Sequence, residues 1–238
     1  MTSTDTSAGA ALYFSWILRF VYDRLVLGLY CKYAWGCPTF TKLTGFYNGN
    51  VEASVSRSSS HRILDVGVGT GFFLEHAPLN QTEDIVLVDL NTNCLDTAAA
   101  RTRKAHPHTH CATVHADVLA DQPLSSDDLG GQFDAISVML LLHCLPGPPA
   151  RKAAALIRLR SLLDEDRGVL FGTTVLGKGV KHNMLGRLIM AWHNSIGVFD
   201  NYDDEAQSFI RPLQEAFKSV KWSVVGTMLL FEARDPIL

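Results

Sequence analysis

The sequence predicts an α/β fold: a doubly wound, mostly parallel seven-stranded sheet with a C-terminal antiparallel hairpin and an N-terminal helical cover. Three observations predict it. Apolar strands alternate with helical stretches from His61 to Val175, a pattern typical of parallel strands joined by right-handed crossovers with helices on both faces. A glycine-rich turn follows the first of these strands. Two apolar strands separated only by Gly226 close the chain, so we expect them to pair as a hairpin.

The elements of the main domain, expected to span 59–238, follow in regular order. Strands are predicted at 61–66, 84–89, 111–115, 133–140, 169–175, 218–225 and 227–233. Helices are predicted at 93–104 and 149–163, with a short helix between the glycine turn and Pro78.

Residues 1–58 are predicted to form a tail and a helical cover. The first ten residues read as a flexible tail, and 12–33 carry apolar residues on nearly every face of a predicted helix. Such a helix must bury most of its circumference against the main domain, a second subunit or a membrane surface. Packing on the domain is favoured, and a homodimer through this helix stays open. A short helix is expected at 40–48, and the serine-rich stretch 54–60 is predicted to be a linker.

Composition and charge narrow the function classes. The 238 residues are 47% hydrophobic and 19% charged, which suits a domain with a sizeable core. Because 24 acidic residues outnumber 21 basic ones, the net charge of -3 offers no general attraction to phosphate backbones, and no nucleic-acid partner is expected. Arg19, Asp23 and Arg24 interrupt the apolar N-terminal stretch, so stable membrane insertion is not expected.

The five cysteines indicate a reducing, cytoplasmic setting. They are odd in number and include no CxxC pair, which argues against a disulfide framework and against a zinc knuckle. The opening residues also lack the basic start of a secretory signal. The histidines of 106–110 alternate around a proline without an acidic partner, so no metal site is predicted.

The motif with the most chemical content is Leu-Asp-Val-Gly-Val-Gly-Thr-Gly at 64–71, followed by Asp89 at the end of the apolar run 85–88. A strand, a glycine turn, a helix and a second strand ending in a carboxylate form a nucleoside-binding half-fold. The glycines let the main chain approach the ligand, and the carboxylate holds ribose hydroxyls. A dinucleotide GxGxxG fingerprint would need glycine at position 72, where this chain has Phe72, so a nicotinamide oxidoreductase is disfavoured.

The GxGxG pattern of Gly67, Gly69 and Gly71 behind Asp65 resembles motif I of the class I S-adenosylmethionine-dependent methyltransferases. This resemblance implies S-adenosylmethionine as the cofactor, with the three glycines beneath its methionine portion. It also implies that Asp65 faces the cofactor's ammonium and that Asp89 takes both ribose hydroxyls.

The resemblance covers about 61–176, and the terminal hairpin more loosely, and it implies further cofactor contacts. Leu90 would lie against the adenine. Asp117 and Val118 resemble the adenine-edge motif, in which Asp117 would accept from the exocyclic amine. Ser137 falls on the segment that resembles the fourth strand, whose end lines the cleft between cofactor and acceptor.

The function predicted on this basis is methyl transfer to a small apolar or aromatic metabolite, with O-methylation favoured. Alignment and a dry pocket can supply much of the acceleration, and a base becomes useful when the acceptor is a hydroxyl or phenol. The candidate bases are His143, His182 and His193, each of which has ordinary packing or hydrogen bonding as its alternative. Aromatic residues of the cover would exclude water and shape the acceptor pocket.

A second function class stays open. A protein of this fold can keep the cofactor and serve instead as a cyclase, an isomerase or a non-catalytic subunit, because a bound sulfonium can act as a fixed charge. The glycines and both motif carboxylates argue that the cofactor is bound in either case. The sequence identifies neither the acceptor nor the methylated atom.

Overall fold

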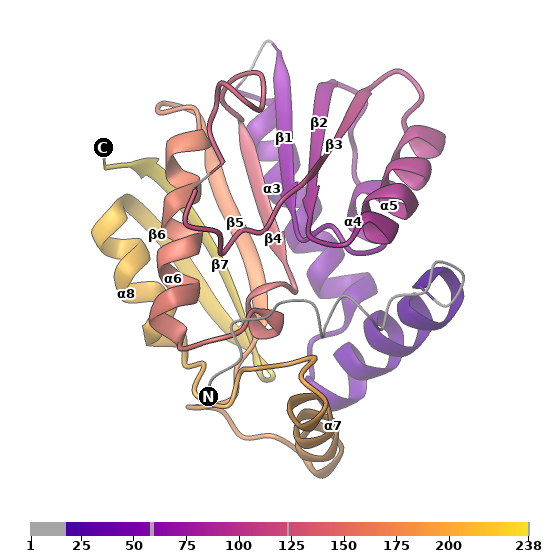
Figure 1. Ribbon diagram of the computed structural model, residues 1–238, viewed down its shortest axis with the longest axis vertical. Helices are drawn as coiled ribbons and strands as arrows, with labels where there is room; N and C mark the ends of the chain where they lie inside the picture. Colours follow the sequence, from indigo (N-terminus) through magenta and orange to yellow (C-terminus); the bar gives the residue numbers. More distant parts are fainter. Residues whose placement is uncertain (1–17, 58–59, 123, 238) are drawn as a thin grey trace.

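A computed structural model describes residues 18–57, 60–122 and 124–237 of the chain. The predicted tail and the first part of the predicted cover helix, 12–17, lie outside these residues. The described residues form one seven-stranded sheet in the order β3-β2-β1-β4-β5-β7-β6 (Figure 1). Its strands are β1 (His61–Val66), β2 (Thr82–Asp89), β3 (His110–His115), β4 (Ala135–Met139), β5 (Val169–Val175), β6 (Phe217–Val225) and β7 (Met228–Pro236).

The pairing of the strands confirms the predicted fold class. β1 pairs in parallel with β2 and with β4, β2 with β3, and β4 with β5. Only β7 breaks the pattern, since it runs antiparallel to both β5 and β6. The order of the sheet therefore reverses between β1 and β4, which leaves a crevice at their carboxyl ends.

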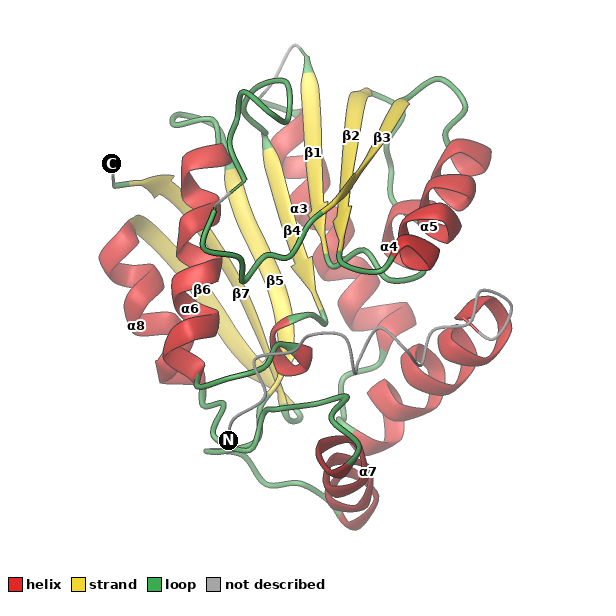
Figure 2. Cartoon of the chain, viewed as in Figure 1, coloured by secondary structure: helices red, strands yellow, loops and turns green. Residues whose placement is uncertain are grey.

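Helices cover both faces of the sheet (Figure 2). The N-terminal segment forms η1 (Leu18–Ala34), η2 (Thr39–Leu43) and α3 (Thr44–Val55). The later helices are α4 (Phe72–Glu75), α5 (Thr92–Ala105), α6 (Pro149–Arg158), α7 (Met184–Ser195) and α8 (Ala206–Ala216), with single turns at η3 (Leu142–Cys144) and η4 (Leu159–Leu162).

The core lies in two layers, one on each face of the sheet. Tyr47 of α3 and Leu95 of α5 belong to one cluster of buried side chains, and Leu156 of α6 and Phe209 of α8 belong to the other. Figure 1 shows α6 and α8 in front of the sheet and α3 behind it. Because each helix buries one apolar stripe against the sheet, the loops at the strand ends stay free to form a site.

Some predicted boundaries were wrong. The stretch 54–60 is not a linker throughout, because α3 continues to Val55 and buries Ser54. The Ser54 hydroxyl donates to the carbonyl of Val51 at 2.7 Å and meets Nε2 of His61 at 2.7 Å, so it is held by the helix and by β1. The helix expected at 40–48 is the joined η2 and α3, and the helix expected at 149–163 ends as α6 at Arg158 before the turn η4. No prediction covered α8, which contains Pro212, a residue that normally disrupts a helix.

The helices η1 and α7 pack together beyond the carboxyl ends of the strands (Figure 1). The Asn183 side chain donates to the carbonyl of Tyr33 at 2.7 Å, and the rings of Tyr30 and His193 meet edge to face at 5.7 Å. Leu27 of η1 is buried in the core, so one face of this helix packs on the domain as predicted. No helix within the described ranges is long and apolar enough to cross a membrane.

A buried ion pair fixes the segment that follows α7. The ammonium of Lys152 on α6 donates to both carboxylate oxygens of Asp204, at 2.9 and 2.8 Å, and to the carbonyl of Asp200. Burial raises the pKa of Asp204 to about 6, while the charge of Lys152 lowers it. The carbonyl of Asp204 also accepts from the main-chain N–H of Gly177 at 3.0 Å, so the chain just after β5 is bonded to the chain just before α8.

Candidate cofactor and acceptor site

A pocket lies at the carboxyl ends of β1, β2 and β4, where the strand order reverses. Its walls come from the glycine turn at 67–71, the residues 89–91 after β2, the residues 116–118 after β3, and the residues 139–141 with 144 and 145 after β4. Leu27 of η1 and Val198 after α7 complete the lining. The cover and the sheet therefore both contribute to one site.

Two glycines of the turn are needed for different reasons, close packing at Gly71 and a left-handed conformation beside open space at Gly69. Gly71 has φ +72, and a Cβ built there would stand 2.8 Å from Cα of Ala98, so the turn packs directly on α5. Gly69 has φ +54, and nothing lies within 4 Å of the place its Cβ would take. Side chains other than glycine rarely adopt this left-handed conformation. Gly71 is therefore required by packing, and Gly69, which lines the pocket, has open space at the place of its Cβ.

Asp89 is held in place by the main chain around it. One carboxylate oxygen accepts from the N–H of Gly69 at 3.3 Å, and the other accepts from the N–H of Asn91 at 2.9 Å. The Asn91 side chain in turn caps α5 by accepting from the N–H of Asn93 at 2.9 Å. Burial raises the pKa of Asp89, and these N–H groups lower it. Since each ionised carboxylate oxygen can accept about two hydrogen bonds, Asp89 keeps acceptor capacity for ligand hydroxyls.

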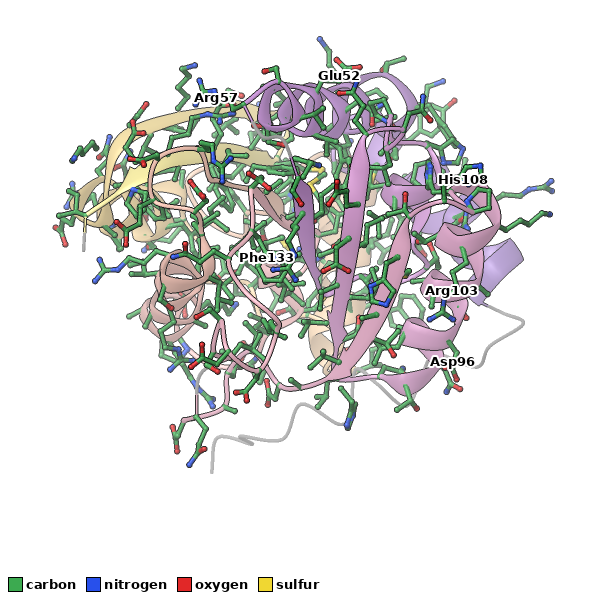
Figure 3. All side chains as sticks on the ribbon, turned by 90° about the horizontal axis from the view of Figure 1, so that it is seen from above. Glu52, Arg57, Asp96, Arg103, His108 and Phe133 are labelled. Carbon is green, nitrogen blue, oxygen red and sulfur yellow. The ribbon has the colours of Figure 1, made fainter. Side chains whose placement is uncertain are left out.

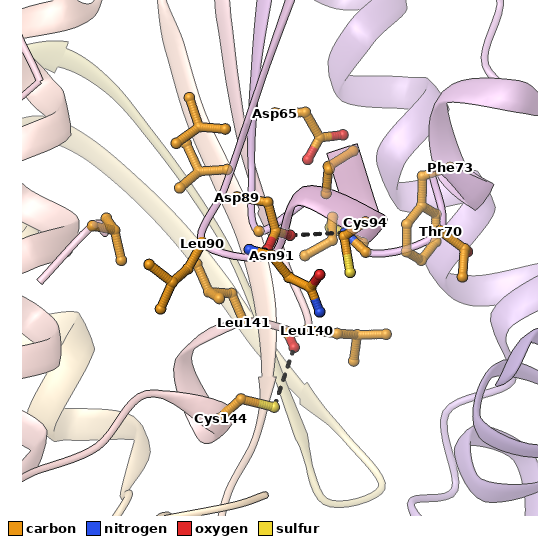
Figure 4. A pocket seen from close by; sticks show the side chains of 18 of the residues that line it. Asp65, Thr70, Phe73, Asp89, Leu90, Asn91, Cys94, Leu140, Leu141 and Cys144 are labelled. Atoms are coloured by element: carbon orange, nitrogen blue, oxygen red, sulfur yellow. Dashed lines mark hydrogen bonds between the residues drawn. The ribbon is translucent and has the colours of Figure 1, made fainter. Parts of the chain in front are cut away.

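Figure 4 shows the arrangement around this carboxylate. Asp89 and Asn91 lie in the middle of the view, with Leu90 and Leu141 on one side and Thr70 on the other. Charged and polar atoms therefore line the pocket beside the apolar side chains of Leu90 and Leu141. That combination suits a ligand with a sugar and an apolar ring.

Asp65 is buried under the glycine turn and linked to the N-terminal segment. Its carboxylate accepts from the hydroxyl of Tyr47 on α3 at 3.2 Å, and the Tyr47 ring stacks on Phe73 at 5.4 Å. Burial raises the pKa of Asp65 to about 7; hydroxyls of Ser137 and Tyr47 lower it, and the charge of Asp89 raises it. This bond could not be predicted from the sequence, because Tyr47 stands among several aromatic residues of the predicted cover.

A second link ties η1 to the glycine turn. The carboxylate of Asp23 accepts from the hydroxyl of Thr70 at 2.7 Å and from the guanidinium of Arg101 at 2.7 Å. Arg101 also donates to the carbonyl of Thr70 at 3.2 Å and pairs with Glu75. The cover is therefore bonded to the loop that faces the ligand. The sequence places Asp23 in the predicted cover, but nothing in its pattern points to Thr70 or Arg101 as its partners.

The structure brings nearly all of the predicted cofactor residues together. The pocket is lined by Asp65, Gly67, Gly69, Gly71, Asp89, Leu90, Asp117 and Val118. The side chain of Asp117 is held by the turn in which it lies, because its carboxylate accepts from the N–H of Leu119 at 2.8 Å. Ser137 is absent from the lining: it is fully buried beside Asp65, its register partner on β1. Its hydroxyl lowers the pKa of Asp65, which does line the pocket.

The structure brings none of the three candidate bases to the pocket lining. His143 is buried, where its Nδ1 accepts from the N–H of Val175 at 3.3 Å, and burial lowers its pKa to about 3. His182 donates to the carbonyl of Leu176 at 2.9 Å, and His193 donates to the carbonyl of Ile189 at 2.8 Å. Burial lowers the pKa of both. Their catalytic role stays a prediction.

The charge of the lining selects among cofactors. Three carboxylates, Asp65, Asp89 and Asp117, line the pocket, and no Lys, Arg or His is among its described lining residues. This surface favours a ligand with positive charge and disfavours a pyrophosphate. Cys144 does not add a charge, because burial raises the pKa of its thiol to about 12. Among the residues that the structure describes, no three His, Cys, Asp or Glu side chains are placed to hold a metal ion.

A crevice at the reversal of strand order, a glycine turn and a carboxylate after the second strand define an α/β enzyme that binds a nucleoside cofactor. The antiparallel strand β7 between β5 and β6 distinguishes it from a dinucleotide dehydrogenase. Residues 63–165 match the family model described as a methyltransferase domain. The chain belongs to the class I S-adenosylmethionine-dependent methyltransferases, and its cofactor is S-adenosylmethionine.

Two curated relatives and one solved structure illustrate this kinship. The chain is 42% identical to methyltransferase verB of Penicillium polonicum, over 92% of this chain and 95% of that protein. It is 37% identical to the physcion biosynthesis cluster O-methyltransferase of Aspergillus chevalieri, over 99% of this chain and 98% of that protein. The N-methyltransferase NodS of Bradyrhizobium japonicum, solved with S-adenosylhomocysteine, superposes with a TM-score of 0.55 over 80% of this chain and 86% of that chain. At 18% identity, this last likeness shows the fold alone.

The residues present fit the cofactor. The open space at Gly69 leaves room for a ligand against the main chain, and the anchored carboxylate of Asp89 can accept hydroxyl hydrogen bonds. When bound, S-adenosylmethionine supplies an electrophilic methyl group on a sulfonium. The described lining residues include three carboxylates and no cation, so no lining charge repels the positive sulfonium.

Proposed function

We propose that this enzyme methylates a hydroxyl oxygen of a small apolar or aromatic metabolite. The observation that carries the proposal is the division of the pocket: its carboxylates stand at β1, β2 and the turn after β3, while Leu27, Phe72, Met139 and Val198 form an apolar remainder. An apolar wall excludes water and accepts a greasy or planar acceptor. The similarity to the O-methyltransferase of Aspergillus chevalieri supports oxygen as the acceptor atom.

We assign the cofactor contacts as follows. Asp89 holds the ribose hydroxyls, Leu90 and Val118 lie against the adenine, and Asp117 accepts from its exocyclic amine. Asp65 faces the ammonium, with Ser137 acting through Asp65. Support comes from their common position on one pocket, Ser137 excepted, and from the main-chain bonds that fix both Asp89 and Asp117.

The direct test of the proposed function uses methyl-labelled S-adenosylmethionine and a panel of phenols and other small hydroxyl compounds. We expect label to appear in at least one phenolic product and to be retained as a methyl ether. Label transferred only to amines or carbon acids would move the reaction to N- or C-methylation. Label in no product, with the cofactor still bound, would favour the cyclase, isomerase or non-catalytic alternative.

The cofactor affinity is expected to rise with pH. Asp65 has a raised pKa of about 7, so at pH 5.5 its carboxyl is mostly protonated in the free enzyme and at pH 7.5 it is mostly ionised. An ammonium favours the ionised form, and we expect the affinity for S-adenosylmethionine to increase roughly tenfold across this interval. Calorimetry at several pH values measures this increase.

Two variants assign that dependence to Asp65. Asp65→Asn should flatten the profile, because the amide does not titrate in this range. In the unaltered enzyme the hydroxyl of Tyr47 lowers the pKa of Asp65. Tyr47→Phe removes that hydrogen bond, so the pKa of Asp65 and the midpoint of the profile should move to higher pH. A profile that is already flat in the unaltered enzyme contradicts the contact between Asp65 and the ammonium.

We test the role of a histidine as general base first with His193. Of the two buried candidates it is the more exposed, at 9% against 4% for His143. We expect His193→Gln to lower kcat/KM for an identified acceptor by less than about tenfold, because the ring donates to a main-chain carbonyl and does not line the pocket. General-base catalysis is worth about 10² to 10⁴ in rate. A loss of that size would give His193 the base role. His182→Gln and His143→Gln complete the series.

The cellular location and the oligomeric state of the enzyme are a separate part of the proposal. All five cysteines are free, which supports a reducing, cytoplasmic location. A homodimer through the N-terminal helix stays a prediction, and sedimentation equilibrium over a range of concentrations measures it.

A further inference from the structure

The outer surface of the cover is apolar in a way that the methyltransferase site does not explain. Eight of the twelve large apolar side chains that are exposed in the described residues lie on 24–51 of the N-terminal cover and on 178–199 around α7, which we together call the cover segments. These eight are Leu29, Tyr33, Phe40, Met184, Leu185, Leu188, Trp192 and Ile196. Monomeric soluble proteins rarely gather so many on one surface unless something binds there.

The stripe on α7 is regular. Met184, Leu188 and Trp192 follow each other at four-residue intervals and are 87%, 68% and 54% exposed. Residues at this spacing stand on one face of a helix. The opposite face, with Ile189 and His193, is buried against the protein. The helix is therefore apolar on both its inner and its outer face.

The helix η1 extends this stripe. Tyr33 is 54% exposed, and its carbonyl accepts the Asn183 side chain directly before Met184. Leu29 lies one helical turn earlier and is 50% exposed. We call the surface formed by Leu29, Tyr33, Met184, Leu185, Leu188, Trp192 and Ile196 the cover patch.

The charged residues within the two cover segments are cations, and carboxylates border the segments: Asp23 and Glu52 flank 24–51, and Asp200 follows 199. The cover segments contain six cationic residues and no Asp or Glu, in a chain whose net charge is -3. The nearest preceding carboxylate, Asp23, is taken up by Thr70 and Arg101. The cations are Arg24, Lys32, Lys42, Lys178, Lys181 and Arg187, all exposed, of which Lys178 lies 3.9 Å from Glu205.

We propose that the cover patch binds the surface of an anionic lipid bilayer. A helix with leucine, methionine and tryptophan on its outer face and cations beside them lies in the plane of a membrane interface. Tyrosine and tryptophan prefer that depth, because their rings are apolar and their polar tips stay hydrated. Each Lys or Arg near an anionic surface adds electrostatic attraction.

A second copy of this chain fits the same surface poorly. A two-fold dimer sets a patch against itself, so the cations of one cover would face the cations of the other. No carboxylate within the two cover segments is present to pair with them. An anionic lipid surface offers apolar depth and negative charge together.

The test is co-sedimentation of the full chain with vesicles of phosphatidylcholine alone or phosphatidylcholine with phosphatidylserine. We expect binding to the serine-containing vesicles that weakens as salt is added. The double variant Leu188→Gln/Trp192→Gln should lower the partition coefficient at least tenfold. Lys181→Glu/Arg187→Glu should lower it at least tenfold on the anionic vesicles.

Matched controls lie outside the cover patch. Trp222→Gln removes an exposed aromatic ring from β6, and Lys218→Glu/Arg211→Glu makes the same change of charge on β6 and α8. Both should bind vesicles as the unaltered chain does. Unchanged affinity for S-adenosylhomocysteine in every variant shows that the fold is intact.

Three outcomes overturn the proposal. The first is absence of binding of the unaltered chain to the anionic vesicles. The second is equal binding by the cover-patch variants and the unaltered chain. The third is a dimer in solution that the cover-patch variants dissociate, which would assign the surface to a second copy.

Discussion

Replacing Asp89 by alanine is expected to raise the dissociation constant of S-adenosylhomocysteine at least about 100-fold. The variant removes a carboxylate that is fixed by N–H groups of both the glycine turn and the start of α5. A hydrogen bond to a charged group contributes about 1.5–3 kcal/mol, so losing two bonds to ribose exceeds the ~2.7 kcal/mol that a 100-fold change requires. The product cofactor has no methyl group to transfer, so calorimetry measures the contact apart from the reaction.

The matched control is Asp96→Ala. Asp96 is an exposed carboxylate on α5, seven residues further along, and it points away from the sheet (Figure 3). Its removal changes the net charge by the same amount without touching the pocket, and binding should stay within about twofold of the unaltered enzyme. Asp89→Asn should fall between the two, because the amide still accepts one bond. Undiminished binding by a folded Asp89→Ala variant contradicts the ribose assignment.

The sheet and the cofactor turn could be predicted because their signals are local. β1 and β5 begin and end where the sequence placed them, since short apolar runs bounded by turn residues mark buried strands. Glycines 67, 69 and 71 and Asp89 are separated by one strand and one helix, and the fold must return them to the same sheet edge. The function followed from this local pattern.

The links between cover and site could not be predicted, because their partners are far apart in sequence. Thr70 and Arg101 lie 47 and 78 residues from Asp23, and Tyr47 lies 18 residues from Asp65. No periodicity connects such positions. Their pairing depends on how η1 and α3 settle on the finished sheet.

The histidines show the opposite difficulty. A histidine in a polar stretch at the sheet edge is a reasonable candidate for a catalytic base. Its ring nitrogens can instead be hydrogen-bonded to main-chain groups that are distant in sequence and that no local pattern reveals. His143 meets Thr174 and Val175, 31 and 32 residues away on the neighbouring strand. Burial then lowers its pKa to about 3, which leaves a neutral ring behind the pocket wall.

Substitutions at Gly69 and Gly71, the second and third glycines of the turn, are expected to have different effects, and this difference tests the structure of the site most sharply. Gly71→Ala sets a methyl group 2.8 Å from Cα of Ala98, where only main chain could give way, at a φ of +72. Left-handed strain of about 1–2 kcal/mol and overpacking of about 1–3 kcal/mol together lower the unfolding free energy by roughly 3 kcal/mol. For a domain of this size, that is a fall in Tm of about 10 °C.

Gly69→Ala has room for its methyl group in the apo protein, so only the left-handed strain applies and Tm should fall by roughly 2–8 °C. Gly69 lines the pocket, where we expect the main chain to touch the ligand, so the affinity for S-adenosylhomocysteine should fall at least tenfold. Thermal melts and calorimetry on both variants separate the two effects. Equal destabilisation with equal retained affinity would mean that the turn only connects β1 to α4, because a cofactor lying against Gly69 cannot tolerate what an empty loop accepts.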